Sequence, residues 1–287
     1  MKSVRLAQIF CPNKESNRTH SKGYVEDLPT QCGQKRCVKM AALNLSVLPS
    51  IQKLLAITFK FSIKYREIDR RTIMLEEIKE DVRRHALEAD CAGLCRHRSG
   101  NFSVRDAANG LICITPTAMD RTEMTAEDIV VIDMDGHTIE SLHDRKPTSE
   151  LMMHTAIYRS RSDVLAVAHT HSRSATAFAV MNKEIPAIVY ELSILGCKEG
   201  YVPVAPYGRP GTRAAAENVL APLAISDVAL MQAHGVVAVA ESLKEALLKA
   251  SYVEELADIY YRCLTVLGHE PATIPADELA KWKYPSV

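Results

Sequence analysis

The hydrophobic residues of this chain recur at helical spacing in two long stretches. From Met74 to Leu87 they return every three to four positions, opposite a run of charged residues, which predicts an amphipathic helix. Ser242 and Glu245 have the spacing of a capping box, and the apolar positions after them keep the same period as far as Gly268, which predicts a second helix with a defined start and stop. The folded part of the chain is therefore expected to begin near Met74.

Between these two helices, short apolar segments alternate with segments of helical period. We expect strands over 101–105, 111–115, 128–133, 164–170, 186–190 and 227–232, and helices over 149–160, 173–182 and 212–220. This alternation is typical of α/β domains. We therefore expect residues 74–287 to form a single α/β domain with a central mixed β-sheet and helices on both faces.

The charge of the chain is balanced overall but unevenly distributed. Residues 1–73 carry 14 Lys and Arg against 5 Asp and Glu, whereas residues 74–287 carry 21 against 30. An excess of positive charge at one end is typical of a nucleic-acid-binding arm or an organelle targeting segment. This segment has neither aromatic residues interleaved with its charges nor an amphipathic Arg/Ser pattern. We therefore expect 1–73 to be a basic extension that is disordered or not part of the natural protein, which would start at Met74.

Cysteine usage and hydropathy bear on the cellular compartment. The eight cysteines have irregular spacings, which is typical of reduced thiols rather than of a disulfide framework. No apolar stretch approaches the roughly 20 residues that cross a bilayer as a helix. We expect a cytoplasmic protein with neither a membrane nor a nucleic-acid partner.

The residues that carry chemistry begin with two histidines at the end of an apolar strand. His169 and His171 share one face, because side chains two positions apart on a strand point the same way. Glu150 lies 19 residues before His169, and His234 lies 63 residues after His171. The histidine pair alone fits a packed core as well as a metal site, but three imidazoles and one carboxylate suit zinc with room left for a substrate.

Five segments in a fixed order extend this pattern to a family. They are SGNFSVR (99–105), ITPTAM (114–119), KPTSE (146–150), AHTHS (168–172) and QAHG (232–235). Together they resemble the signature of the class II aldolase/adducin family, and within it they are most similar to aldolases that act on L-fuculose phosphate. The resemblance covers about residues 75–287 and implies that family's α/β fold.

The resemblance also implies a zinc site. His169, His171 and His234 match the zinc-binding histidines of the family's aldolases, with one Zn²⁺ per subunit. Glu150 matches a carboxylate that binds zinc before the substrate arrives and then acts as the catalytic acid and base. A carboxylate beside Zn²⁺ stays ionised at neutral pH, so this second role is chemically reasonable.

Further site residues follow from the same resemblance. The substrate phosphate is expected to bind neutral donors at six positions, namely Gly100, Asn101, Thr117, Ala118, Thr148 and Ser149. Ala118 departs from the family's usual glycine, which restricts the backbone if this position needs a positive φ. Tyr190 matches a tyrosine that donates a proton to the aldehyde oxygen in a neighbouring subunit's site, and Tyr284 matches a tail tyrosine that covers the site. The resemblance also implies a homotetramer with sites at subunit interfaces.

The function implied is a zinc-dependent aldolase, a carbon–carbon lyase acting on a small sugar phosphate. It would reversibly cleave a ketose 1-phosphate, similar to L-fuculose 1-phosphate, to dihydroxyacetone phosphate and a small aldehyde such as L-lactaldehyde. Three alternatives stay open: an L-ribulose-5-phosphate 4-epimerase, a related sugar-phosphate aldolase or decarboxylase on the same metal site, and a non-catalytic adducin-like binding module. Glu150 favours cleavage over epimerisation, because the similar epimerases look to have the shorter aspartate at this position. Sequence alone leaves the sugar undetermined.

Overall fold

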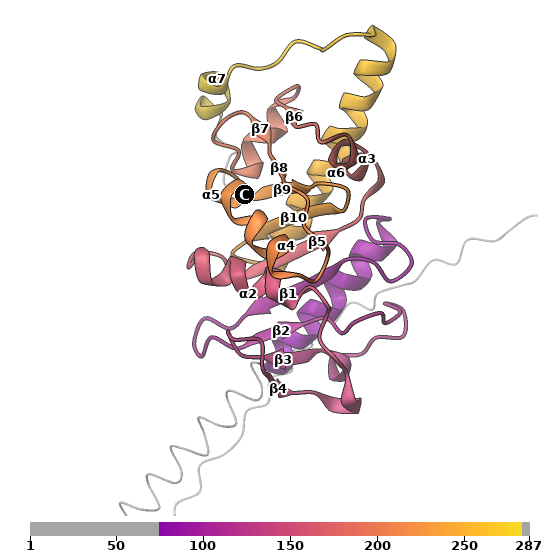
Figure 1. The fold of residues 1–287 in the computed structure, drawn as a ribbon, viewed down its shortest axis with the longest axis vertical. Coiled ribbons are helices and arrows are strands. Elements are labelled where there is room, and N and C mark those ends of the chain that lie inside the picture. Colours follow the sequence, from indigo (N-terminus) through magenta and orange to yellow (C-terminus); the bar gives the residue numbers. More distant parts are fainter. Residues whose placement is uncertain (1–74, 283–287) are drawn as a thin grey trace, which may run out of the picture. The chain divides into compact units, whose positions relative to one another are not determined.

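The structure of the chain, a computed structural model, describes residues 75–282 (Figure 1). The expected basic extension, 1–73, and the expected tail residue Tyr284 lie outside this range, so the structure does not bear on them. Within the described range, none of the helices combines the length and the apolar character needed to cross a membrane.

An eight-stranded sheet forms the centre of the domain. Its order is β4-β3-β2-β1-β5-β10-β9-β8, which can be followed along the labels in Figure 1. The strands are β1 (Asn101–Arg105), β2 (Ile112–Ile114), β3 (Val130–Ile132), β4 (Thr138–Glu140), β5 (Ala166–Thr170), β8 (Val204–Ala205), β9 (Val228–Met231) and β10 (Gly235–Ala240). Neighbouring strands are antiparallel except for β8 and β9, which are parallel. The expected mixed sheet is confirmed.

Helices cover both faces of this sheet. Successive side chains of a strand point to opposite faces, and the two faces have separate cores. Val167 of β5 and Val237 of β10 pack with α2 (Leu151–Ser160), α4 (Arg213–Asn218) and α5 (Leu220–Ile225). On the opposite face, β10 contributes Ala238 to a core with α3 (Arg173–Met181) and α6 (Leu243–Leu267), and Ala168 of β5 packs against a helix that covers 75–91. The expected placement of helices on both faces is confirmed.

The remaining elements are short. They are a two-stranded sheet of β6 (Ile185–Pro186) and β7 (Tyr201–Val202), the 3₁₀ helices η2 (Ala126–Asp128), η3 (Leu142–Asp144) and η4 (Tyr190–Leu195), and α7 (Ala276–Lys281). The five cysteines of the described range are free thiols. Burial raises the pKa of Cys95, Cys113 and Cys197 to about 12, so these three are protonated at neutral pH.

The expected long helix near the C-terminus agrees closely with the structure. In α6, the Ser242 side chain accepts a hydrogen bond from the backbone N–H of Glu245, and Gly268 ends the helix with φ 69°. These are local interactions that need no tertiary partner. For this reason both ends of the helix could be read from the sequence.

Two expected elements differ from the structure. The strand expected over 186–190 is wrong, because the strand stops at Pro186 and the backbone N–H of Ile188 turns back to bond the Pro186 carbonyl. Proline itself donates no ladder hydrogen bond. The helix expected over 212–220 is divided into α4 and α5, since the ring of Pro222 conflicts with the carbonyl four residues earlier, at Asn218, where α4 ends.

Candidate metal centre and substrate cavity

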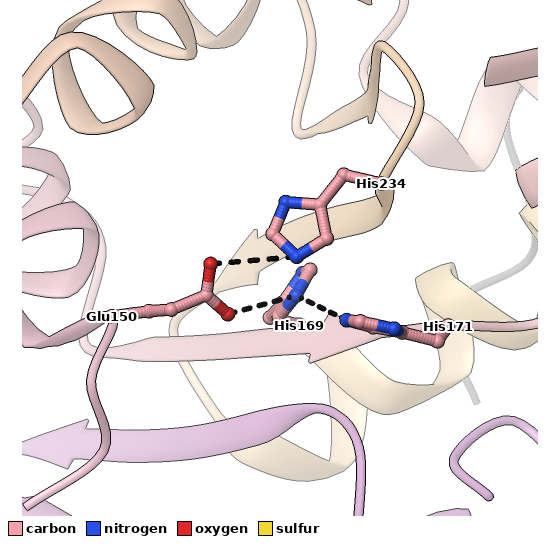
Figure 2. Close-up of side chains that lie close together, drawn as sticks. All are labelled: Glu150, His169, His171 and His234. Atoms are coloured by element: carbon pink, nitrogen blue, oxygen red, sulfur yellow. Dashed lines mark hydrogen bonds and ion pairs between the residues drawn. The ribbon is translucent and has the colours of Figure 1, made fainter. Parts of the chain in front are cut away.

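Three neighbouring elements bring the four expected metal ligands together. His169 is in β5, and His171 is the first residue after this strand. Glu150 is the N-cap of α2, and His234 lies in the turn between β9 and β10. His169 is paired with Val237 in the antiparallel register of β5 and β10, which places the His234 turn beside the end of β5. In Figure 2 the four side chains point toward one another.

Gly235 allows the His234 turn to approach β5. A Cβ at this position would lie 2.3 Å from the carbonyl oxygen of Thr170 and 3.4 Å from the His169 ring. The contact with the backbone oxygen of Thr170 is too close for any side chain, so a glycine is required after His234 for steric reasons.

The four side chains form a tight cluster. The Glu150 carboxylate lies 3.1 Å from His169 Nε2 and 3.5 Å from His234 Nε2. His171 Nε2 lies 2.9 Å from His169 Nε2. One ligand atom from each of the four residues lies within 4.8 Å of all the others.

The chemistry of these donors fits a metal ion. The ring nitrogen Nδ1 of His169 lies 2.8 Å from the carbonyl oxygen of Val236 and donates to it, so in the neutral ring Nε2 carries a lone pair. That lone pair faces a carboxylate oxygen and a second imidazole Nε2. Electron-rich atoms converge in this way when a cation binds among them, and a carbonyl that holds the far nitrogen of a histidine is a usual support for a metal ligand.

Burial and the contacts within the cluster shift the pKa values of all four groups. Burial raises the pKa of Glu150, but the electrostatic interactions of the carboxylate with His169 and His234, and hydrogen bonds from His169 and Asn101, outweigh burial and place this pKa well below its usual range. Burial lowers the pKa of His169, and the Glu150 carboxylate more than reverses that effect. Burial also lowers the pKa of His171 to about 3 and that of His234 to about 4, so both rings are neutral and able to bind a metal.

A cavity of about 280 Å³ adjoins the cluster. Its lining includes all six residues expected to bind phosphate and three of the four expected metal ligands: Gly100, Asn101, Thr117, Ala118, Thr148, Ser149, Glu150, His171 and His234. Thr148 and Ser149 come directly before α2, whose N-terminal N–H groups and dipole favour an anion. Segments that are far apart in the sequence thus meet around one small space.

Two backbone positions shape this cavity. Gly100 has φ 74°, and a Cβ there would lie 2.4 Å from Cys95 Sγ, while the buried guanidinium of Arg121 donates to the Gly100 carbonyl at 2.6 Å. Ala118 has φ 53°, in the left-handed region that favours glycine. The position therefore does need a positive φ, and this chain adopts it with an alanine.

Comparison with known proteins now identifies the family. A family model described as the Class II Aldolase and Adducin N-terminal domain matches residues 80–261. The chain belongs to this family. It is 33% identical over 207 residues to the 5-deoxy-D-ribulose 1-phosphate aldolase of Bacillus thuringiensis serovar kurstaki, covering 72% of this chain and 94% of the relative.

Fuculose-phosphate aldolases show the same similarity. The L-fuculose phosphate aldolase of Escherichia coli K12 is 37% identical over 192 residues, which cover 67% of this chain and 85% of that protein. A solved L-fuculose 1-phosphate aldolase superposes with a TM-score of 0.66 at 32% identity, covering 71% of this chain and 93% of the other. Members of this class II aldolase group are metal-dependent lyases, so the chain is an aldolase-type enzyme and the cluster around His169 is its candidate metal site.

Tyr190 lies away from the cavity of its own class II aldolase domain. It is 42% exposed at the start of η4, and its ring lies 4.7 Å from that of Trp282 between centroids. It does not line the cavity beside Glu150. The expectation that Tyr190 serves a neighbouring subunit stays a prediction.

The cavity also contains a residue that the sequence pattern did not single out. Arg98 lines it, and its Nη1 lies 3.4 Å from the carbonyl oxygen of Ala118, which Nη1 approaches as a donor. Arg98 lies two residues before Gly100, so proximity in the sequence was the only available signal. Its positive charge at the rim adds to the attraction of the cavity for an anion.

Proposed function

We propose that this class II aldolase is zinc-dependent and reversibly cleaves a ketose 1-phosphate to dihydroxyacetone phosphate and a small aldehyde. The observation that carries the proposal is the shared cavity: Glu150, His171 and His234 line the same space as the six expected phosphate donors. A substrate with a phosphate at one end and vicinal oxygens at the other matches this arrangement. Three nitrogen donors and one carboxylate suit zinc.

Different residues of the chain would bind the metal and the substrate phosphate. Zn²⁺ held by His169, His171, His234 and Glu150 would supply a Lewis acid for the oxygens of the ketose half. Thr148 and Ser149, at the N-terminus of α2, would hold the phosphate with uncharged donors, so that the product can leave. These contacts fix the carbon chain of the substrate relative to Glu150.

Glu150 would act as the acid and base of the reaction. In the cleavage direction it would deliver a proton to the carbon that loses its bond to the aldehyde half, and in the reverse direction it would remove that proton. The low pKa of Glu150 keeps it ionised and ready to accept this proton in the reverse direction. In the cleavage direction the substrate hydroxyl that becomes the aldehyde oxygen releases a proton, and Glu150 would take up a proton before passing it to that carbon. Tyr190 of a neighbouring subunit, with the tail residue Tyr284, would serve the aldehyde oxygen and close the site.

The names of the relatives support a ketose 1-phosphate as the substrate. The proteins from B. thuringiensis and E. coli are named for 5-deoxyribulose 1-phosphate and for fuculose phosphate. Cleavage of either sugar leaves dihydroxyacetone phosphate as the common half and changes only the aldehyde. We propose L-fuculose 1-phosphate, with L-lactaldehyde as the aldehyde product, and 5-deoxyribulose 1-phosphate is the second candidate because a relative of similar identity is named for it.

The proposal includes the assembly and the working part of the chain. We propose a cytoplasmic homotetramer with sites at subunit interfaces, which the exposed position of Tyr190 supports. We also propose that 74–287 is the working domain and that removal of 1–73 leaves activity unchanged. Gel filtration with light scattering, and activity of the truncated protein, would test both points.

A coupled assay tests the function itself. The metal-free protein would be reloaded with zinc and mixed with a panel of ketose 1-phosphates, and release of dihydroxyacetone phosphate would be followed through NADH oxidation by glycerol-3-phosphate dehydrogenase. We expect release with at least one sugar and none after chelation. Conversion of L-ribulose 5-phosphate to D-xylulose 5-phosphate, with no dihydroxyacetone phosphate from any sugar, would replace the aldolase proposal with an epimerase.

A further inference from the structure

A chain of buried polar side chains leads from Glu150 into the core between α2 and β1. Its members are Asn101 and Ser103 of β1 and His154 and Tyr158 of α2, each at most 5% exposed. Asn101 Nδ2 donates to Glu150 Oε2 at 2.8 Å, and Asn101 Oδ1 lies 2.5 Å from His154 Nε2. On the far side of the ring, His154 Nδ1 lies 2.7 Å from Ser103 Oγ, which lies 2.7 Å from the Tyr158 hydroxyl.

The ionised carboxylate sets the direction of these hydrogen bonds. Because Glu150 only accepts, the amide nitrogen of Asn101 must face it and the amide oxygen must face His154. His154 must then donate from Nε2, and burial, which lowers the pKa of this ring to about 3, leaves it a single ring proton. Nδ1 must therefore accept from the Ser103 hydroxyl. The roles of Asn101, His154 and the Ser103 hydroxyl are therefore all fixed by the Glu150 carboxylate.

We propose that His154 is a positioning residue, which fixes the amide of Asn101 and through it holds the Glu150 carboxylate against the histidine cluster. If His154 were unable to donate, Asn101 could rotate and turn its oxygen toward Glu150, where two acceptors would repel each other. The inference rests on the proposed role of Glu150 as acid and base. His154 does not touch the substrate cavity, so it acts only through Asn101.

The same contacts could merely fasten α2 to the sheet, and kinetics separate the two roles. In His154→Leu the donor to Asn101 is lost, and we expect kcat to fall by about 10- to 100-fold, as for other residues that orient a ligand from behind. KM should change little, because the other five expected phosphate donors stay in place. His154→Gln keeps an N–H donor near the position of Nε2 and should restore most of kcat.

Thr155→Val is the matched control. Thr155 is the next residue of the same helix, is also buried, and its hydroxyl bonds only the Met152 carbonyl. This variant should lower thermal stability without changing kcat. A His154→Leu enzyme that folds with wild-type kcat, or a kcat loss of equal size in Thr155→Val, would overturn the positioning role.

A double-mutant cycle tests the route of the effect. If His154 acts through Asn101, then Asn101→Ala with His154→Leu should be no slower than Asn101→Ala alone. Losses of kcat that multiply would show that His154 acts independently of Asn101 and would contradict the proposal. The double mutant Asn101→Ala/Thr155→Val is the control, because Thr155 is not expected to interact with Asn101, and the kcat of this double mutant should equal that of Asn101→Ala.

A spectroscopic readout keeps this proposal separate from the proposed function. Protein labelled with ¹⁵N-histidine and loaded with zinc should show His154 as the tautomer protonated at Nε2, with its signal assigned by its absence in His154→Gln. The opposite tautomer, or a charged ring, would refute the inference even in an active aldolase. Failure of the wild-type protein to cleave any sugar phosphate would instead refute the aldolase proposal and leave the tautomer result standing.

Discussion

Replacement of Gly235 by alanine should damage metal binding more than folding. A Cβ there would lie 2.3 Å from the Thr170 carbonyl oxygen, whereas ordinary contact begins at 3.4 Å, so β5 and β10 must separate locally by about 1.1 Å. The same methyl group would lie 3.2 Å from the His171 ring and 3.4 Å from the His169 ring. The clash therefore falls on Thr170, between two of the expected ligands, with a tight contact to the His171 ring, and it moves the turn that carries His234.

The size of the effect follows from the contact. Overpacking of this kind costs about 1 to 3 kcal/mol of stability, and at about 2 to 4 °C per kcal/mol for a domain of this size the Tm should fall by about 2 to 12 °C. Displacement of His234 relative to His169 and His171 should weaken zinc binding by about 10- to 100-fold. The zinc dissociation constant would be measured by competition with a chelator of known affinity, and Tm by calorimetry.

Gly110→Ala is the matched control for this experiment. Gly110 has φ 73°, and its nearest neighbour to an added Cβ is Met134 Cγ at 4.0 Å, so alanine there strains the backbone without a clash and lies far from the cluster in the sequence. It should lower Tm and leave zinc affinity unchanged. Wild-type zinc affinity in a folded Gly235→Ala protein would refute the argument that the close approach at Gly235 assembles the ligands.

Three further predictions concern the cavity, its backbone and a remote ion pair. Glu150→Gln should still bind zinc but lose about 10²- to 10⁴-fold in turnover, the usual contribution of a positioned acid and base, and near wild-type cleavage by the metal-loaded variant would show that the base lies elsewhere. Ala118→Gly should raise stability by about 1 kcal/mol, because glycine relieves the left-handed backbone, and an unchanged denaturation midpoint would contradict that strain. Asp128 is buried, and although burial raises its pKa, hydrogen bonds from Thr125 and Arg145 (the latter at 2.8 Å) lower it more, to about 2 from 3.8. Because the pKa of Asp128 is lower in the folded than in the unfolded protein, ionised Asp128 stabilises the fold at a pH above its unfolded-state pKa, and this contribution is lost as pH falls from about 4 toward 2. Urea unfolding of Asp128→Asn and the wild type would measure it. Equal losses of stability over this pH range in the two proteins would show that Asp128 is not responsible.

The helices and strands were predicted most accurately where their limits depend on interactions between residues close together in the sequence. The limits of α6 depend on Ser242, Glu245 and Gly268, which interact within one turn of the helix. The strand expected over 186–190 had an apolar composition, but the backbone N–H of Ile188 bonds the Pro186 carbonyl, so the segment turns there and the strand ends at Pro186. β10 was not expected at all, since its continuous run of small and branched apolar residues, buried on both faces, has no alternating pattern.

For a similar reason, the sequence predicted some residues of the candidate site but not the contacts between them. Three of the four expected ligands line one cavity with the six expected phosphate donors, and the fourth, His169, lies in the cluster beside it. These residues could be named from the sequence, because short motifs with distinctive side chains can be recognised without knowledge of their neighbours. The contact of Asn101 with both Glu150 and His154 could not be foreseen. It depends on how α2 lies on β1, and no local spacing records that packing.

The sequence by itself determined which chemical groups this protein has and where its strongest local elements begin and end, because capping, periodicity and motif identity are properties of neighbouring residues. Only the tertiary structure decided which of these groups face one another. The antiparallel register of β5 with β10 places His169 beside the His234 turn, and the packing of α2 on β1 connects Glu150 to His154. Register and packing are set by contacts between distant segments, whose geometry depends on the whole core.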